Sequence, residues 1–388
     1  MRSTSSWATR FSIVTLVALT SLLLGAKCPG LNPLAQQELS DAGVDKYLGD
    51  FTPVATEDVG DGWTKHTFDP DGGDGPICIA GTPFSAFTRA GNPTKLLIFE
   101  QGGGACWQDF YFCNILAEDQ EAPPEFPVGI WDFDNPDNPF HDYSIVYMPY
   151  CDGSVFSGDN DVPDANFPFG PVRFHRGMRN QSAAMDLAKA TFPNANRITV
   201  SGSSAGGVGA SGFAPYLVRF LYGNNVKLTV FNDAGPVAVN LDDTANIAAR
   251  AADWQFGQFY PASCTACSDT GQNTAAIQWR LDNDSTIREA IYETDGDATN
   301  RFFLEPPFGM SQVDFRDLIV TEHGALNAAH PLRYKRFFVS GDDSHTALQT
   351  PLFYSQDANG VPLNLWTQAF LNFPVFWADI VEDFVPLP

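Results

Sequence analysis

Six apolar segments of strand length recur between residues 95 and 341, and they constrain the fold more than any other feature. They are KLLIFE (95–100), YSIVYMPYC (143–151), RITVSG (197–202), KLTVFND (227–233), REAIYET (288–294) and YKRFFVSG (334–341). Nearly continuous apolar runs are typical of strands that are covered on both faces, as in a parallel sheet. Helical patterns lie between some of them, at 179–190 and at 209–223, where Pro215 interrupts the second pattern. This alternation predicts an α/β fold with a mostly parallel central sheet flanked by helices.

Long segments rich in Phe, Pro, Asp and Gly interrupt this rhythm, at 110–142, 152–177 and 234–287. Insertions of this kind line the substrate cleft in α/β enzymes, so we expect them over the active site. Residues 31–75 are acidic and rich in turn residues, and we expect little regular structure there. The 388 residues suit one large domain. We therefore predict a lead-in over 27–75 and one catalytic domain over 76–388.

The N-terminus has the pattern of a signal peptide, which we assign to residues 1–26. Arg2 and Arg10 flank an apolar run over 11–24, and small residues follow it. The run is short for a membrane span, so we expect an exported protein, secreted or periplasmic, without an integral span after signal removal. Cys28 raises the alternative of lipid anchoring, but the preceding Lys27 does not suit a lipobox.

Six cysteines remain when Cys28 is set aside, and an exported chain can oxidise them. Six cysteines allow three bridges in 15 connectivities. We expect the pairs Cys106–Cys113, Cys264–Cys267 and Cys78–Cys151, with other connectivities open. The CTAC segment at 264–267 has no second cysteine pair and no nearby histidine, so a structural bridge is favoured over zinc or redox chemistry.

The net charge of −24 comes from 46 acidic against 22 basic residues, without a basic cluster. Such a surface repels nucleic acid, which excludes a nucleic-acid partner. The acidic segment DNDVPD (159–164) lacks the spacing of an EF-hand, so we expect a solvated loop there. We expect neither a metal nor a cofactor.

The segment GSSAG (202–206) fits the pattern Gly-x-Ser-x-Gly. A predicted strand leads into it and a helical pattern leads out, which is the setting of the nucleophile elbow in the α/β-hydrolase fold. In such an elbow Ser204 is exposed above the sheet, and the N–H of Ala205 faces the substrate carbonyl. The alternative is a Gly/Ser turn that caps a helix.

An oxyanion hole needs a second amide donor, usually from the loop after an earlier strand. The segment EQGGGACW (100–107) directly follows the strand 95–100, and we assign the N–H groups of Gly103 and Gly104 to this role. The segment has neither the lysine of a P-loop nor GxGxxG spacing, so a phosphate cradle is disfavoured.

A serine nucleophile needs a base and an orienting acid, which follow it in chain order in this fold. His345 lies just after the strand-like 334–341, whereas no strand leads into His323 or His330. Asp297 follows the strand 288–294 and is the favoured acid. Two alternatives stay open, Asp295 on the same loop and Asp233 at the end of the preceding strand.

These residues lie in a chain that resembles the pectin acetylesterase/Notum family of α/β-hydrolase carboxylesterases. The matching stretches, in family order, are ICIAG (77–81), LIFEQGGGACW (97–107), YMPYCDGSVFSGD (147–159), FHRGMRN (174–180), VSGSSAGG (200–207), FNDAG (231–235), the Asp297 loop and SHTAL (344–348). Plant-type members carry Gly-Gly-Gly-Trp-Cys where this chain has Ala105 before Cys106, with Trp107 one place later. In this respect the chain is more similar to the bacterial branch of the family.

The resemblance implies Ser204, Asp297 and His345 as the triad and a Cys106–Cys113 bridge beside the oxyanion loop. It also implies removal of an acyl group, which is acetate from pectin in plant members and a longer fatty acyl group from a signalling protein in Notum. We expect an exported serine carboxylic-ester hydrolase that removes acetyl groups from an acetylated polysaccharide such as pectin.

Two alternatives remain for the function. One is an esterase for longer acyl chains in lipids or polyesters. The other is a catalytically silent binding protein, which the filled triad positions disfavour. Trp107 and Phe110 follow the oxyanion loop and are expected either to wall the acyl pocket or to fill core.

Overall fold

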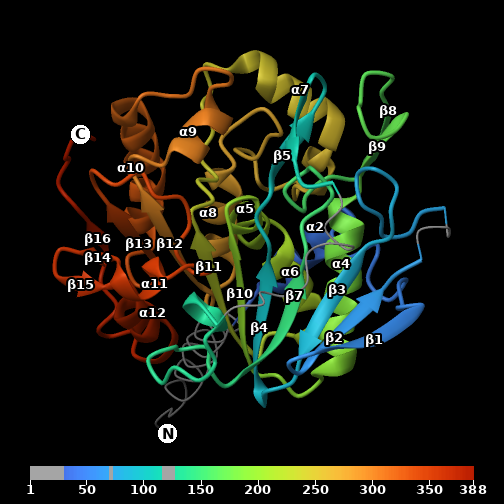
Figure 1. Ribbon diagram of the computed structural model, residues 1–388, viewed down its shortest axis with the longest axis horizontal. Coiled ribbons are helices and arrows are strands. Elements are labelled where there is room, and N and C mark those ends of the chain that lie inside the picture. The colour runs from blue at the N-terminus through green and yellow to red at the C-terminus, as the bar shows by residue number, and fades with distance from the viewer. Residues whose placement is uncertain (1–29, 70–72, 116–126) are drawn as a thin grey trace, which may run out of the picture.

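A ten-stranded sheet forms the centre of the computed structural model, which describes residues 30–69, 73–115 and 127–388 (Figure 1). The strands within these ranges are, in spatial order, β1 (Ala55–Gly60), β2 (Trp63–Thr67), β3 (Ser85–Arg89), β7 (Tyr143–Met148), β4 (Asn92–Glu100), β10 (Arg197–Ser203), β11 (Lys227–Asp233), β12 (Arg288–Thr294), β13 (Tyr334–Val339) and β16 (Ile380–Val381). Neighbours from β7 to β16 pair in parallel, and those from β1 to β7 pair antiparallel. All six predicted strands are present and mutually parallel.

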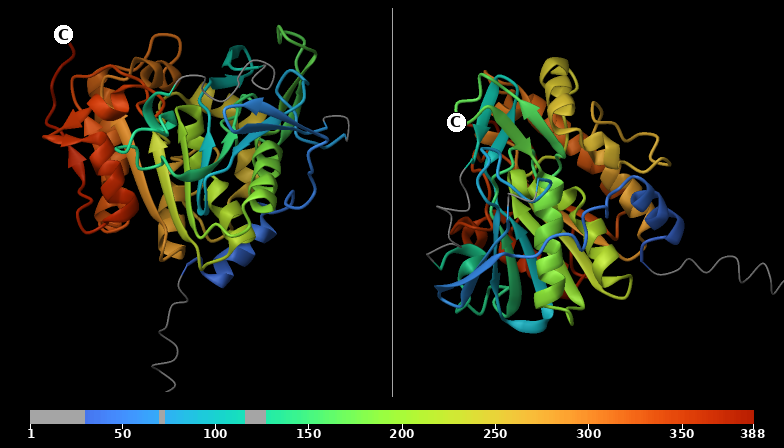
Figure 2. Two further views of the ribbon diagram at one scale, coloured as in Figure 1. Left: turned by 60° about the horizontal axis from the view of Figure 1, so that its bottom comes forward. Right: turned by 90° about the vertical axis from the view of Figure 1, so that its right-hand side faces the viewer.

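Both faces of the sheet are covered, because alternate side chains of its strands belong to two separate apolar cores. In β4, Leu96 and Ile98 belong to one core, whereas Leu97 and Phe99 belong to the other. Helices pack on both sides of the sheet, as Figure 2 shows. The helices in the described ranges are α2 (Pro33–Asp41), α4 (Gly177–Thr191), α5 (Ala205–Ser211), α6 (Ala214–Tyr222), α7 (Thr244–Trp254), α8 (Thr274–Asn283), α9 (Ala298–Leu304), α10 (Gln312–Ala329), α11 (Leu352–Ser355) and α12 (Leu363–Asn372). This arrangement is the predicted α/β-hydrolase architecture.

Two expectations about local structure are wrong. Residues 31–75 are not irregular, because they contain α2 and the β1–β2 hairpin, which extends the central sheet. The helical pattern at 209–223 is two helices, since α5 ends at Ser211 and α6 begins at Ala214. Pro215 lies in the first turn of α6, where its missing N–H leaves no hydrogen bond unmade.

Shorter elements lie in the insertions between the main strands. They are the hairpin β5 (Gly104–Trp107) with β6 (Phe110–Cys113), the hairpin β8 (Asn160–Pro163) with β9 (Val172–His175), the hairpin β14 (Asp357–Ala358) with β15 (Val361–Pro362), and the 3₁₀ turns η1 (Gly129–Trp131) and η2 (Phe256–Phe259). Hairpin β5–β6 contacts α7, and the two lie together near α9 at the top of Figure 1.

Three disulfides join the cysteines in the expected pairs, Cys78–Cys151, Cys106–Cys113 and Cys264–Cys267. The signal peptide and Cys28 lie outside the described residues. Among the helices that the structure does describe, none combines the length and apolarity needed to cross a membrane.

Candidate active site

Ser204 occupies a sharp turn between the end of β10 at Ser203 and the start of α5 at Ala205. Its φ of 58° lies in the left-handed region, which side chains other than glycine adopt only under constraint. A Cβ at Gly202 would overlap the carbonyl of Gly206, and a Cβ at Gly206 would overlap that of Glu100. The glycines of the motif are therefore required by close backbone approach, and the strained turn is the predicted strand–turn–helix elbow.

The loop of Gly102 to Gly104 lies directly against this elbow. A Cβ at Gly102 would be 2.7 Å from the Ser203 carbonyl oxygen and 3.0 Å from Ser204 Cβ. Gly104 has φ of 79° and opens β5, and the Gly103 carbonyl accepts from the Asn114 amide at 2.8 Å. Gly104, Ala205 and Ser204 line one pocket. Gly104 and Ala205, two of the residues assigned to the oxyanion hole, therefore share a pocket with Ser204, whereas Gly103 is not among the residues that line it.

His345 follows β13 on a loop, and its Nδ1 lies 2.6 Å from Asp297 Oδ2. Asp297 is fully buried and is the N-cap of α9, where its Oδ1 accepts from the Asn300 amide at 2.9 Å. The Asn300 side chain donates to Asp297 Oδ2 at 2.9 Å. These contacts fix the carboxylate, which in turn fixes the imidazole ring of His345.

The other two carboxylates considered for the acid have different partners. Asp295 pairs with Arg316 at 2.7 Å and accepts from Ser340 Oγ and the Gly341 amide. Asp233 accepts from Ser203 Oγ and from the amides of Ala347 and Leu348, and its burial raises its pKa to about 6. Asp233 therefore connects the elbow to the loop that carries His345, and Asp295 is committed to an ion pair.

A second carboxyl group, which the sequence analysis missed, lies beside Asp297. Glu293 is fully buried in β12, and its Oε2 accepts from Asn300 Nδ2 at 3.0 Å. Burial, the charge of Asp297 and a hydrogen bond with Asp297 raise the pKa of Glu293 well above its ordinary value. A carboxyl group with a raised pKa keeps its proton to higher pH, and a protonated Glu293 can donate a hydrogen bond to Asp297. A glutamate inside an apolar strand segment was the available sequence signal.

The pocket that contains Ser204 has a volume of about 100 Å³ and mainly apolar walls. Trp107 lines it, whereas Phe110 is not among the lining residues and stacks on Trp107 with ring centroids 4.0 Å apart. Its other walls come from the segment 236–239, from α7 and from α9. Residues of the 234–287 insertion and of the segment Gly104 to Trp107 thus form walls of this pocket, whereas the insertion at 152–177 contributes only Val155 and the described part of that at 110–142 contributes none.

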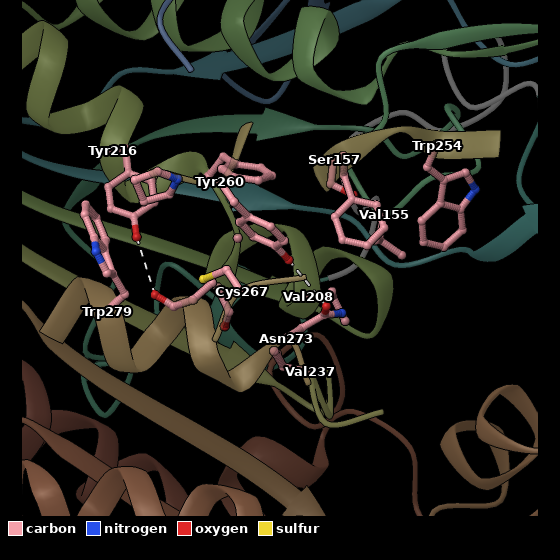
Figure 3. Close-up of a pocket in the computed structure, with 16 residues that line it drawn as sticks. Val155, Ser157, Val208, Tyr216, Val237, Trp254, Tyr260, Cys267, Asn273 and Trp279 are labelled. Atoms are coloured by element: carbon pink, nitrogen blue, oxygen red, sulfur yellow. Dashed lines mark hydrogen bonds between the residues drawn. The ribbon is translucent and has the colours of Figure 1, made fainter. Parts of the chain in front are cut away.

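A second apolar cavity of about 50 Å³ adjoins this pocket. Five residues line both, Val155, Val208, Val237, Trp254 and Asn273. Figure 3 shows Trp254 and Val155 at one end of the second cavity and the rings of Tyr216 and Trp279 at the other. Space therefore continues from the serine toward α6 and α8.

The acidic segment 159–164 is not a freely solvated loop, contrary to expectation. Asp159 pairs with Lys46 and Arg179, and the carboxylates of Asp161 and Asp164 pair with other arginines. Lysine and arginine side chains from other segments therefore neutralise the aspartates of 159–164. Within the described ranges, no group of His, Cys, Asp or Glu is arranged to hold a metal ion.

Comparison with known proteins gives three similarities. Residues 71–268, about half of the chain, match the family model described as pectinacetylesterase. Pectin acetylesterase 4 of Arabidopsis thaliana is 32% identical over 146 residues, which cover 34% of this chain and 34% of that protein. The chain thus spans about a third of this curated relative. The Wnt deacylase Notum from Drosophila superposes with a TM-score of 0.58 at 17% identity, covering 79% of this chain and 93% of that one, a likeness of fold.

Proposed function

Because this chain belongs to the pectinacetylesterase family, whose members are carboxylic ester hydrolases, we propose that it cleaves an ester through Ser204, His345 and Asp297. The observation that carries this proposal is the 2.6 Å contact between His345 Nδ1 and Asp297 Oδ2, on a loop that Asp233 ties to the Ser204 elbow. A serine, a base and an orienting acid in this order form a complete nucleophilic unit.

In the proposed mechanism, Ser204 Oγ attacks the ester carbonyl carbon while His345 Nε2 takes its proton. The N–H groups of Ala205, Gly103 and Gly104 stabilise the oxyanion, and one such donor is worth roughly 3 kcal/mol in comparable sites. The bond to the alcohol oxygen breaks, and His345 returns the proton to that oxygen. Water, deprotonated by His345, then attacks the acyl-enzyme, which releases the carboxylic acid and regenerates Ser204. Asp297 holds His345 in the tautomer that has a proton on Nδ1.

We propose a short acyl group, acetyl above all, carried by an acetylated polysaccharide such as pectin. The volume of about 100 Å³ supports this assignment, because an engineered apolar cavity of about 150 Å³ holds a molecule as large as benzene. An acetyl group is smaller than benzene and fits. The similarity to a protein named pectin acetylesterase supports the polysaccharide, and the three disulfides support export.

A second candidate function is hydrolysis of esters with longer acyl chains. The adjoining apolar cavity favours it, since a chain that passed Val208 and Val237 would enter a second apolar space. A catalytically silent binding protein is disfavoured, because Ser204, His345 and Asp297 are all present.

Hydrolysis of p-nitrophenyl esters from acetate to palmitate tests both functions. We expect kcat/KM to be highest for acetate and to fall steeply beyond butyrate. Ser204→Ala should abolish turnover, whereas Ser355→Ala, at an exposed serine on α11, should leave it unchanged. A rate maximum at eight carbons or more would select the longer-chain function. Turnover that survives Ser204→Ala would refute the triad.

A further inference from the structure

Arg250 is the one charged residue among the described residues that line the Ser204 pocket. It lies on α7, and its guanidinium carbon lies 5.4 Å from the centre of the Trp107 ring. The ring itself is fixed, because Trp107 Nε1 donates to Asn246 Oδ1 at 3.0 Å and Phe110 stacks on the ring. A half-buried cation is thereby held at the wall of the pocket that contains the nucleophile.

The fully buried arginines of the described residues each pair with a carboxylate, whereas the half-buried Arg250 has no such partner. Arg173 pairs with two aspartates, Arg219 pairs with Asp284, and Arg280 pairs with Glu289. In the part of the chain that the structure describes, no side chain forms an ion pair or a hydrogen bond with the Arg250 guanidinium. The chain has 46 acidic residues, so a lone guanidinium does not reflect a shortage of carboxylates.

Leaving this guanidinium unpaired has a cost. Burial lowers the pKa of Arg250 to about 10, only partly offset by the charge of Asp243, so the side chain stays protonated at neutral pH. A guanidinium has five N–H donors in a planar fork that matches a carboxylate, and a desolvated cation binds such a partner more strongly than an exposed one. The missing partner is therefore expected from the ligand.

We propose that Arg250 binds a carboxylate of the substrate, so that the preferred substrate is an acyl ester of an acidic sugar. This inference rests on the proposed ester hydrolysis and adds a specificity determinant to it. The net charge of −24 repels an anionic substrate at long range, but 0.15 M salt screens charges beyond about 8 Å. A single unpaired cation at the pocket wall then outweighs the distant surface charge.

A matched pair of substrates tests the proposal at 0.15 M salt. One is an O-acetylated methyl galactopyranosiduronic acid, and the other is its uronamide, which has the same shape without the charge. We expect kcat/KM for acetate release to be about 10- to 100-fold higher for the acid. Arg250→Gln should remove most of this ratio, and Arg250→Lys should keep part of it, because lysine keeps the charge without the fork.

Arg288→Gln is the matched control, and it should keep the full ratio. Arg288 lies on the ring of Phe370, is also desolvated, and is at the amino end of β12, away from the pocket. The proposal is overturned if the wild-type protein shows no preference for the acid, or if Arg250→Gln lowers kcat/KM equally for the acid and the uronamide. If Arg250→Gln fails to fold, Arg250→Lys decides: a ratio of kcat/KM for the acid to that for the uronamide below the wild-type ratio supports the proposal, and an unchanged ratio overturns it.

Turnover of p-nitrophenyl acetate reports separately on the proposed ester hydrolysis. If it is absent, calorimetric binding to the Ser204→Ala variant still tests Arg250. Tighter binding of galacturonate than of galacturonamide, lost on adding Arg250→Gln, supports the proposal. Equal binding of the two overturns it, as does binding of inorganic phosphate without any advantage for galacturonate.

Discussion

Replacing Glu293 by glutamine should give a protein whose stability advantage over the wild type grows as the pH rises above the ordinary glutamate pKa. Glu293 faces Asp297 and lies in the field of Asp233, with Asn300 and the Thr294 amide as its neutral partners. Burial first, and then the charge of Asp297, raise its pKa well above the ordinary value. Glutamine keeps the size and the donor toward Asp297 but has no proton to lose.

The sign follows from proton counting. Above the ordinary glutamate pKa of about 4.3, the unfolded chain has lost this proton while the folded protein keeps it, so stability falls as pH rises. The slope from one such group is about 1.4 kcal/mol per pH unit until the folded pKa is reached. Glu293→Gln removes this contribution, so its advantage over the wild type should grow by up to about 3 kcal/mol over two pH units.

Urea unfolding at pH 5.5, 6.5 and 7.5 measures the free energies. Glu57→Gln, on the exposed edge strand β1, is the matched control and should show a constant difference from the wild type. The reasoning is refuted if the difference between Glu293→Gln and the wild type does not grow with pH. It is also refuted if Glu293→Gln is the less stable protein at pH 7.5.

Three further predictions concern the elbow, the acid and the oxyanion loop. Asp297→Asn should lower kcat by about 10³- to 10⁴-fold. Asp295→Asn should change kcat by no more than a few fold but lower the free energy of unfolding by about 3 kcal/mol. Ester kinetics and urea unfolding measure these effects, and a large loss of kcat in Asp295→Asn but not in Asp297→Asn would show that Asp295 is the acid. Gly206→Ala should destabilise the protein by about 1–3 kcal/mol, because its Cβ would overlap the Glu100 carbonyl; an unchanged unfolding midpoint would contradict this. Replacing Cys106 and Cys113 by serine should lower the free energy of unfolding by about 2 kcal/mol. It should also lower kcat by loosening the β5–β6 hairpin. An unchanged kcat would show that the loop is ordered without the bridge.

Sequence alone could locate the central sheet and the positions of Ser204 and His345, because parallel strands end at the same edge of a sheet. It could not assign Asp233, since a carboxylate at a strand end gives no information on where its oxygens point. Glu293 and Arg250 were missed for a related reason, because their roles depend on which groups surround them in the fold. Glu293 lies beside a second carboxyl group, and Arg250 lies on an aromatic ring without a carboxylate partner.

The β1–β2 hairpin was missed although a local signal was present. Asp61 and Gly62 both have positive φ and lie at the turn, as Asp-Gly does in tight hairpins. The acidic, turn-rich composition of the surrounding residues obscured this signal. β1 is exposed along its whole length, so no apolar alternation identified it as a strand.

The contacts of Asp233 have a consequence for how this site can change during evolution. Asp233 joins Ser203, the residue before Ser204, to the amides of Ala347 and Leu348, just after His345. If Ser204 and His345 act as proposed, these contacts tie their two loops together without help from Asp297, so we expect that the orienting acid can be lost or moved to another loop while a reduced activity survives for selection to improve. Loss of Asp233 would separate the two halves of the site at once, so its position should vary less among descendants of this chain than that of Asp297.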